Sequence, residues 1–412
     1  MFGMHEIRRA KAPRRVLSLS AAAAFALGAA PAAFAADPAT VSIALIVPLS
    51  GDWGEQGVLM REGAEFAVDK INSEGGIKSL GGAKLKLVVA DTGNSVETAV
   101  SAAQRVLDAG DISAATGSWL SSFTLAETEI AERAHVPWIT FSYADKVTAR
   151  GYKYTFRDNA PSSQQVSQGL KEVLEASAAT GHPIQTLAIA SDNTAAAQAG
   201  LNAIKKYAPA LGLKIVVEKI WTPPLSDPDS IASAIKDAKP DLIWGGATTL
   251  SDTSGLVQAL RAHKVAAPLL GAGSQFLTEA FIKAVGGADN VNGLATIVGD
   301  GVLKGMEPLN QEFEAIHHHP MIEDMADTYA EIWIIKEALE KAGSADPQKV
   351  RDAMASLDIT SGPASFIPGG AVKFDETGQN AKAEVAIQQW QDGKIVTVAP
   401  AKAAVGALIP LR

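Results

Sequence analysis

The stretch "LSGDWGEQGVLMREGAEFAVDKINSEGG", residues 49–76, joins a glycine-rich turn to a long amphipathic segment. The run 41–47 directly before it is short and apolar, as in a buried strand of a parallel sheet. After the turn, apolar residues recur at the spacing of a helix with one buried face: Met60, Ala64, Ala67 and Ile71. Strand, turn and helix in this order predict a βα unit.

The same alternation of short apolar runs and helical patterns continues along the chain. Repeated βα units predict an α/β fold with open, doubly wound parallel sheets that are covered by helices on both faces. The length of the chain suits two domains of ordinary size or one large domain. The further runs that predict strands are residues 85–90, 112–115, 137–141, 187–190, 215–220, 242–244 and 294–298.

The N-terminal segment, residues 1–35, has the pattern of a cleaved export signal. Basic residues precede an Ala/Leu-rich run that ends in a small-x-small sequence, so we expect cleavage near Ala35 and Ala36. The pair Arg14 and Arg15 is compatible with a twin-arginine signal as well as with a general secretory signal. The sequence therefore predicts export and leaves the route open.

Composition excludes several classes of protein. The chain has no cysteine, so we expect neither disulfides nor a lipid anchor on a cysteine. Without residues 1–35, 31 Lys and Arg face 44 Asp and Glu, a net charge of −13, which argues against nucleic acid and anionic lipid as partners. After the signal, no run approaches the ~20 uninterrupted apolar residues of a membrane span, so we expect a soluble mature chain.

Open parallel sheets bind ligands beyond the carboxyl ends of their strands, where loops meet helix N-termini. The loop "GSWLSS", residues 117–122, is a candidate because its serines and backbone N–H groups open the helix predicted over 123–134. A helix start of this kind suits a carboxylate, although a serine can also serve only as a helix cap. The other predicted strand-end loops are residues 50–54, 91–95, 142–145, 191–194, 246–249 and 271–275.

Cofactor sites and enzymatic sites are disfavoured. Gly51, Gly54 and Gly57 follow the spacing G-x-x-G-x-x-G, whereas a dinucleotide fingerprint needs G-x-G-x-x-G, although Asp91 follows the second strand as a ribose-binding acid would. The chain also lacks a phosphate-binding loop, a nucleophile elbow, a cysteine nucleophile and the zinc motif H-E-x-x-H. We therefore expect no cofactor and no catalysis.

Several motifs in a fixed order carry a family resemblance over essentially the whole mature chain. The chain resembles the leucine/isoleucine/valine-type (branched-chain amino acid, type I) periplasmic solute-binding proteins of ABC importers. The resemblance implies two lobes joined by three hinge crossings, with a cleft between them and no catalysis. The motifs are "PLSGDWGEQG", "REGAEFAVDKINSEGGI", "LKLVVADTGN", "GSWLSS", "HVPWITFS", "TARGYKYTFR" and "DTYAEIWIIKEALEKAGS".

The same resemblance implies where the protein acts and with which partners. It implies a monomeric periplasmic protein that captures a small organic solute and delivers it to a membrane permease and its ATPase. A related fold serves as the sensor domain of receptors, so a sensing role stays open as an alternative. The expected lobes are residues 36–157 with 299–383, and residues 158–298 with 384–412.

Site residues of the first lobe are implied by their places in the family motifs. Trp53 stands where the family carries an aromatic residue against the ligand, and its flanking glycines would let the backbone approach a solute. Ser121 falls on the serine that holds a carboxylate, with Ser122 beside it. Around the next strand end, the positions that hold the carboxylate and the ammonium fall near Ser142 and Ala144.

The second lobe departs from the pattern of amino-acid binders. Ala195 and Ala196 stand where those proteins place a tyrosine, and Gly273 stands in the place of the acid that neutralises an α-ammonium. A buried ammonium without an anion would cost several kcal/mol. The candidates that remain in or near this part of the site are Asp192, Thr248, Ser274, Glu323 and Asp324.

These departures predict a carboxylate without an α-ammonium, such as a keto, hydroxy or aromatic acid, with Trp53 and Tyr143 against its apolar part. A neutral amide or a branched-chain amino acid is the alternative, because Asp192 or Asp324 could restore the missing charge.

The run "HHHPMIED", residues 317–324, is the remaining candidate for chemistry. Adjacent histidines cannot all reach one ion from a regular helix, so a metal site is disfavoured. The simpler interpretation is a loop at the mouth of the cleft, in which His317, His318 or His319 could hydrogen-bond the ligand.

Overall fold

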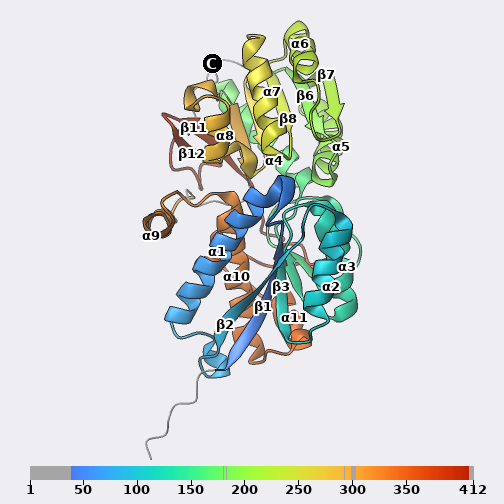
Figure 1. Ribbon diagram of the computed structural model, residues 1–412. Coiled ribbons are helices and arrows are strands. Elements are labelled where there is room, and N and C mark those ends of the chain that lie inside the picture. The colour runs from blue at the N-terminus through green and yellow to red at the C-terminus, as the bar shows by residue number, and fades with distance from the viewer. Residues whose placement is uncertain (1–38, 180, 182, 292, 298–302, 408–412) are drawn as a thin grey trace, which may run out of the picture. The chain divides into compact units, whose positions relative to one another are not determined.

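A computed structural model describes residues 39–179, 181, 183–291, 293–297 and 303–407 (Figure 1). The predicted export signal, residues 1–35, lies outside the described residues. Within the described part of the chain, no helix is both long and apolar enough to cross a membrane. The described chain forms two α/β lobes, each built on one sheet, which confirms the predicted fold class.

The first sheet is entirely parallel. Its strand order is β2-β1-β3-β4-β5, so the chain changes its direction of winding between β1 and β3. Ligand sites of open sheets lie at such a switch point, beyond the carboxyl ends of the strands. The strands are β1 (Thr40–Val47), β2 (Lys84–Asp91), β3 (Ile112–Gly117), β4 (Trp138–Thr140) and β5 (Thr155–Arg157).

Alternating side chains of β1 build the two halves of the first lobe's core. Ile43, Leu45 and Val47 pack on the side of helix α1, whereas Ala44 and Ile46 pack on the side of α2 and α3. Figure 1 shows α1 on one side of this sheet and α2 and α3 on the other. The helices are α1 (Gly54–Ser73), α2 (Val96–Leu107) and α3 (Ser121–Ala134).

The second sheet has the strand order β12-β11-β10-β9-β8-β6-β7. Its parallel part has a switch point between β6 and β8, so the loops after these two strands form the second lobe's candidate site. The strands are β6 (Thr186–Asp192), β7 (Lys214–Trp221), β8 (Leu242–Gly246), β9 (Leu269–Ala272), β10 (Gly293–Ile297), β11 (Ala386–Gln391) and β12 (Lys394–Ala399).

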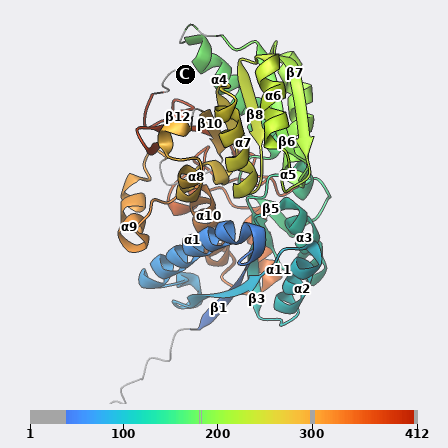
Figure 2. The same cartoon turned by 45° about the horizontal axis from the view of Figure 1, so that its top comes forward.

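Helices cover both faces of the second sheet. Leu187 and Ile189 of β6 pack with residues of α4 and α5, whereas Ala188 and Ala190 belong to the core on the side of α6 and α7. Figure 2 shows α6 and α7 in front of the strands β6 and β8. The helices are α4 (Ser162–Ala179), α5 (Ala195–Ala210), α6 (Pro228–Ala238), α7 (Leu250–Ala262) and α8 (Glu279–Ala284).

The edge of the second sheet differs from the all-parallel prediction. Strand β11 pairs antiparallel with both β10 and β12. The turn between β11 and β12 consists of Asp392 and Gly393, both with positive φ (49° and 76°), which is the geometry of a tight hairpin turn. A two-residue Asp-Gly loop therefore closes the sheet with a hairpin instead of a further βα unit.

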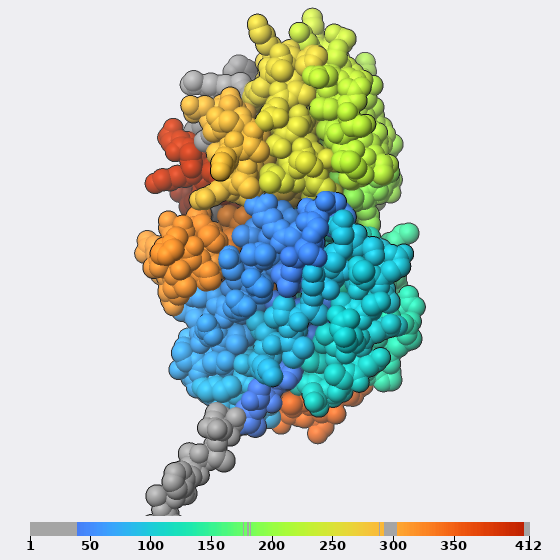
Figure 3. Space-filling view, viewed as in Figure 1, coloured from blue at the N-terminus to red at the C-terminus, as the bar shows by residue number. Residues whose placement is uncertain are grey.

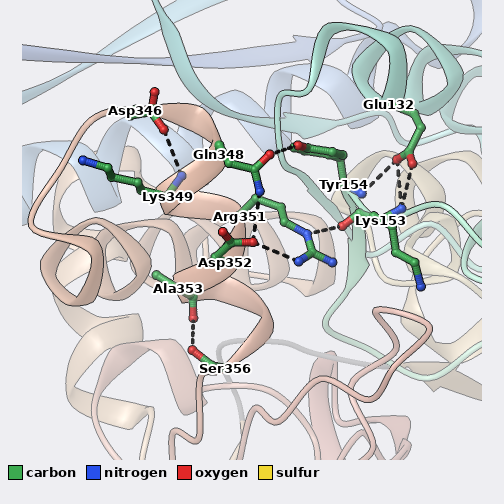
Figure 4. Close-up of polar contacts among 10 residues, drawn as sticks. All are labelled: Glu132, Lys153, Tyr154, Asp346, Gln348, Lys349, Arg351, Asp352, Ala353 and Ser356. Atoms are coloured by element: carbon green, nitrogen blue, oxygen red, sulfur yellow. Dashed lines mark hydrogen bonds and ion pairs between the residues drawn. The ribbon is translucent and has the colours of Figure 1, made fainter.

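The last helices return to the first lobe. Lys70 of α1 forms an ion pair with Glu312 of α9 at 2.7 Å, and the two helices lie side by side in Figure 3. In α11, Arg351 donates from Nε to the carbonyl of Lys153 at 2.6 Å, and Gln348 accepts from the hydroxyl of Tyr154 (Figure 4). These helices are α9 (Glu307–His317), α10 (Glu323–Ala342) and α11 (Pro347–Ala355).

Single 3-10 turns complete the described elements. They are Gly51–Trp53, Lys78–Leu80, Asp145–Val147, Ser274–Phe276, Ala288–Asn290 and Pro363–Ser365. The assignment of residues 36–157 with 299–383 to one lobe and of the remainder to the other stays a prediction.

Candidate functional site

One cavity lies where the strand-end loops of both sheets meet, and we call it the interlobe cavity. Its volume is about 70 Å³, which suits a small solute and not a chain of several units. Both switch points contribute to its walls. The lining residues are Trp119, Leu120, Ser121, Ser122, Tyr143, Ser162, Gln165, Val166, Thr194, Ala195, Ala196, Ala197, Gly200, Trp244, Gly246, Ala247, Thr248, Ala272, Gly273 and Gln275.

Two helix N-termini point their first turns into the interlobe cavity. Ser121 and Ser122 are the first residues of α3, and residues 195–197 are the first residues of α5. The first N–H groups of a helix have no acceptor within the helix, and the helix dipole places partial positive charge there. Among the described residues that line the cavity, none carries an ionisable acid or base of the Asp, Glu, Lys, Arg or His type. The described lining therefore offers helix N–H groups and no formal charge, while the acids Asp192, Glu323 and Asp324 lie behind it.

Large apolar groups form the other walls. Trp119 and Leu120 come from the loop between β3 and α3, and Trp244 comes from the interior of β8. Val166 of α4 lies among them. Aromatic walls of this kind bury the flat apolar part of a ligand while helix amides hold a polar end.

Ser121 lines the cavity, its contact with a carboxylate stays a prediction, and neither Ser121 nor Ser122 caps the helix. The N-cap of α3 is Leu120, which has no side-chain hydrogen bond of that type. The Ser121 hydroxyl accepts the N–H of Ala144 at 3.2 Å, and its own proton can be donated to a ligand. Ser122 lies beside it and lines the same cavity.

In the loop after β4, Tyr143 lines the cavity, whereas Ser142 and Ala144 contact the loop after β3 and the start of α3. Tyr143 lines the cavity and donates its hydroxyl to Glu323. Ser142 is buried, donates to the carbonyl of Ser118 at 2.6 Å and lies 2.5 Å from the Thr124 hydroxyl. Ala144 is buried, donates its N–H to Ser121 and accepts at its carbonyl from Arg157, and neither Ser142 nor Ala144 is among the lining residues.

Both carboxylate oxygens of Asp192 accept hydrogen bonds from residues of the same lobe. One carboxylate oxygen accepts from the N–H and hydroxyl of Thr194 at 2.9 and 2.7 Å, and the other accepts from the N–H and hydroxyl of Thr248 at 2.8 and 2.7 Å. Burial raises the pKa of this carboxyl, and these hydrogen bonds lower it in part. Asp192 thus joins the two loops of the switch point, and Thr248, although it lines the cavity, gives its hydroxyl to Asp192.

Asp324 and Ser274 lie beside the cavity and contact each other. The buried Asp324 accepts from the indole N–H of Trp119 at 3.1 Å and from the hydroxyl of Ser274 at 2.8 Å. Burial raises the pKa of Asp324 to about 7. Neither residue is among those that line the cavity.

Trp53 packs on the first lobe. Its ring meets Phe123 edge to face, with centroids 5.8 Å apart and planes at 87°, and it is not among the lining residues. The glycines around it serve close packing within the chain, since a Cβ on Gly57 would lie 1.5 Å from the Pro48 carbonyl O. A contact between Trp53 and a ligand stays a prediction.

Most residues that line the cavity were not selected from the sequence, and three of these have large side chains that a ligand could contact: Trp119, Trp244 and Gln275. Trp119 stands inside the quoted loop "GSWLSS", so its place in a strand-end loop was a usable signal. Trp244 looked like an ordinary strand residue, and nothing local marks it. Gln275 donates from Nε2 to the carbonyls of Ala247 and Ala272, and its buried Oε1 has no hydrogen-bond partner in the described part of the chain. That oxygen is available to a donor on a ligand.

The three histidines do not converge. His317 stacks on Phe313 with centroids 4.1 Å apart, His318 is exposed at the end of α9, and His319 faces Glu62 at 3.2 Å. Among the described residues, no group of three or more His, Cys, Asp or Glu side chains could hold a metal ion.

A buried acid behind the loop of Trp119 predicts a pH-dependent stability. Glu127 is completely buried, and burial raises its pKa to about 8, although it accepts a hydrogen bond from Ser118. Because the pKa of Glu127 is higher in the folded state than in the unfolded state, this group contributes stability that is fully present below pH 4.5. The contribution is lost as the pH rises through 8, by at most roughly 1.4 kcal/mol per pH unit. We expect Glu127→Gln to melt close to wild type at pH 5 and at a higher temperature at pH 8, as measured by calorimetry.

The exposed Glu129→Gln on the same helix is the control and should follow wild type at both pH values. If Glu127→Gln and wild type lose the same number of degrees between pH 5 and 8, Glu127 is not the group responsible.

Comparisons with known proteins agree with this geometry. A family model described as "Periplasmic binding protein" matches residues 40–394. A similar protein is the Leu/Ile/Val-binding protein homolog 7 of Brucella suis, 27% identical over 410 residues, which cover 96% of this chain and 98% of the relative.

Two solved structures share the fold. The substrate-binding protein LivJ of a branched-chain amino acid transporter of Streptococcus pneumoniae, solved with isoleucine, has a TM-score of 0.74 at 20% identity and covers 88% of this chain and 100% of its own. An ABC-transporter solute-binding protein of R. palustris, solved with benzoate, has a TM-score of 0.73 at 20% identity and covers 89% of this chain and 97% of its own.

Proposed function

Because the chain belongs to the periplasmic binding protein family, we propose that it is the extracytoplasmic solute-binding component of an ABC uptake transporter of the branched-chain amino acid type. We further propose that its solute is a small carboxylate without an α-ammonium group, of the aromatic acid kind. The observation that carries the proposal is the interlobe cavity, into which two helix N-termini point and whose described lining holds no ionisable acid or base of the Asp, Glu, Lys, Arg or His type.

The electrostatics of the cavity favour an anion over a zwitterion. A carboxylate can accept from the amides of α3 and α5 and from the hydroxyl of Ser121, in charge-assisted bonds worth on the order of 1.5–3 kcal/mol each. An α-ammonium would need an anion, and both oxygens of Asp192 are already taken by Thr194 and Thr248. Desolvating an ammonium there would cost several kcal/mol.

The apolar walls favour an aromatic acid. Trp119, Trp244 and Tyr143 present rings to the cavity, and a flat ligand ring gains about 0.5–1.5 kcal/mol from such a contact beyond its area burial. The R. palustris protein of the same fold holds benzoate. The alternative is an amino acid or amide, which is supported by the isoleucine held by the S. pneumoniae protein.

Delivery to a permease and its ATPase, a monomeric state and a periplasmic location belong to the same proposal. They follow from the family and from the export signal predicted over residues 1–35. A ligand-sensing role is the second candidate, and genes for a permease and an ATPase beside this one would favour transport.

A thermal-shift and calorimetric screen of the mature chain tests the ligand class. Benzoate, benzamide, leucine and 4-methyl-2-oxopentanoate, the 2-keto analogue of leucine, form a matched set that separates charge from shape. We expect benzoate at about 100 times its Kd to stabilise the protein by ~2.7 kcal/mol, and benzamide and leucine to give little shift. Tight leucine binding with no response to either carboxylate would refute the ligand class and leave the family assignment intact.

A further inference from the structure

A single carboxylate connects a loop of the first sheet with a loop of the second sheet. Asp324, in the first turn of α10, accepts the indole N–H of Trp119 at 3.1 Å through Oδ1 and the hydroxyl of Ser274 at 2.8 Å through Oδ2. Trp119 follows β3 of the first sheet, and Ser274 follows β9 of the second sheet. We call this pair of hydrogen bonds the Asp324 bridge.

Sequence neighbours of the residues in the Asp324 bridge line two different cavities. Trp119, Gly273 and Gln275 line the interlobe cavity. Ile322, Met325 and Leu277 line a larger cavity of about 800 Å³, which we call the side cavity. The two residues that flank Ser274 thus face the interlobe cavity, and those near Asp324 on α10 face the side cavity.

We propose that Asp324 is the latch of the interlobe cavity, which holds the loops of Trp119 and Ser274 together and must release Ser274 before the cavity opens. This inference rests on the proposed function only in that the interlobe cavity holds a solute. Asp324 is then a positioning residue: it orients the Trp119 wall, and it makes closure of the lobes favourable through its bond to Ser274.

The chemistry of the bridge makes the bond a strong one. Asp324 and Ser274 are both buried, with exposures of 0% and 1%, so water does not compete for the bond. In its ionised form, Asp324 loses a charge-assisted hydrogen bond when one donor is removed, and it gains nothing in exchange. The partly buried Trp119 donates to the other oxygen, so each half of the bridge can be removed separately.

The test uses the full mature chain, which has no cysteine of its own. Cysteines in place of the exposed Arg105 on α2 and Lys236 on α6 carry two dyes, and single-molecule energy transfer reports the separation of the lobes. We expect Ser274→Ala to lower the ratio of closed to open molecules about tenfold without any solute. Trp119→Phe keeps an aromatic wall and should leave this ratio within a factor of about three.

A matched control and a second arm separate the latch from a general loss of structure. Ser365→Ala removes a hydroxyl that bonds to Gly362 within its own turn and should leave the ratio unchanged. With benzoate as the probe, Ser274→Ala should raise koff about tenfold and leave kon within about threefold, a split that a loss of structure would not give.

Equal ratios of closed to open molecules in wild type and Ser274→Ala would overturn the latch. The other informative result is that benzoate alters the ratio of closed to open molecules in neither wild type nor Ser274→Ala, while the solute-free ratios differ as expected. That result would contradict the proposed ligand class and support the latch.

Discussion

Alanine at position 57 is expected to destabilise the protein by about 3 kcal/mol or more. Gly57 is buried near the start of α1, and a Cβ there would lie 1.5 Å from the carbonyl O and 2.4 Å from the carbonyl C of Pro48. Both are backbone atoms, so no change of rotamer relieves the clash. Helix α1 would have to move away from the end of β1, and the contacts of Met60 and Ala64 with the core would loosen.

Calorimetry of Gly57→Ala at neutral pH measures this effect, with Gly255→Ala as the matched control. Gly255 also lies inside a helix, and no atom lies within 4 Å of a Cβ built on it. Alanine is the better helix former by about 1 kcal/mol, so Gly255→Ala should melt at the same or a higher temperature. An unchanged melting temperature in Gly57→Ala would mean that α1 does not lie against Pro48 in solution.

The fold could be predicted because its signals are local and repeat. In β1, apolar residues on both faces indicate a strand buried on both sides, and Ile43 and Ala44 do pack into different cores. The order of the motifs gave the family, which the match over residues 40–394 confirms. Strand β5, with the sequence Thr-Phe-Arg at Thr155–Arg157, was missed because it lies in no apolar run, whereas the equally short β4 lies in the predicted run 137–141. The hairpin at Asp392 has the turn signal Asp-Gly, but it was not predicted because the sheet was expected to consist of βα units only.

The site could be predicted only in part, because its residues are selected by distance across the sheets and not by local pattern. Ser121, Ser122, Tyr143 and Thr248 line the interlobe cavity and were proposed from strand-end loops together with the family motifs, but the same reasoning also proposed Ser142 and Ala144, which do not line it. Trp244 lines it from inside a strand, where sequence gives no sign of a nearby opening.

Buried acids show the limit of reasoning from charge alone. Asp192 and Asp324 are acids near the site, as a missing ammonium partner would be. Their hydrogen bonds to threonine, serine and tryptophan side chains give both carboxylates protein partners instead. Whether a buried acid serves a ligand or the fold depends on donors that are far away in sequence, here by 56 residues between Asp192 and Thr248 and by 50 between Ser274 and Asp324.

An acid introduced at the start of α5 is expected to abolish carboxylate binding and spare the fold. Ala196 lines the interlobe cavity and is the second residue of α5. An aspartate in the first turn of a helix is favourable for the helix itself by about 0.3–1 kcal/mol, so Ala196→Asp should fold. Its carboxylate would occupy the place of the ligand's carboxylate, and we expect at least a ~100-fold loss of benzoate affinity in calorimetry, equivalent to about 2.7 kcal/mol.

Ala196→Asn is the matched control, because it adds nearly the same volume without a charge. We expect it to weaken benzoate by less than about tenfold, so the ratio between the two variants isolates the electrostatic part. Equal losses in the two variants would show that volume alone is responsible and would contradict an anion site at this helix start. The Ala196→Asp variant also distinguishes the two ligand classes: its new carboxylate would supply the anion that an α-ammonium lacks, so a gain in leucine affinity is expected only if an amino acid fits the remaining walls.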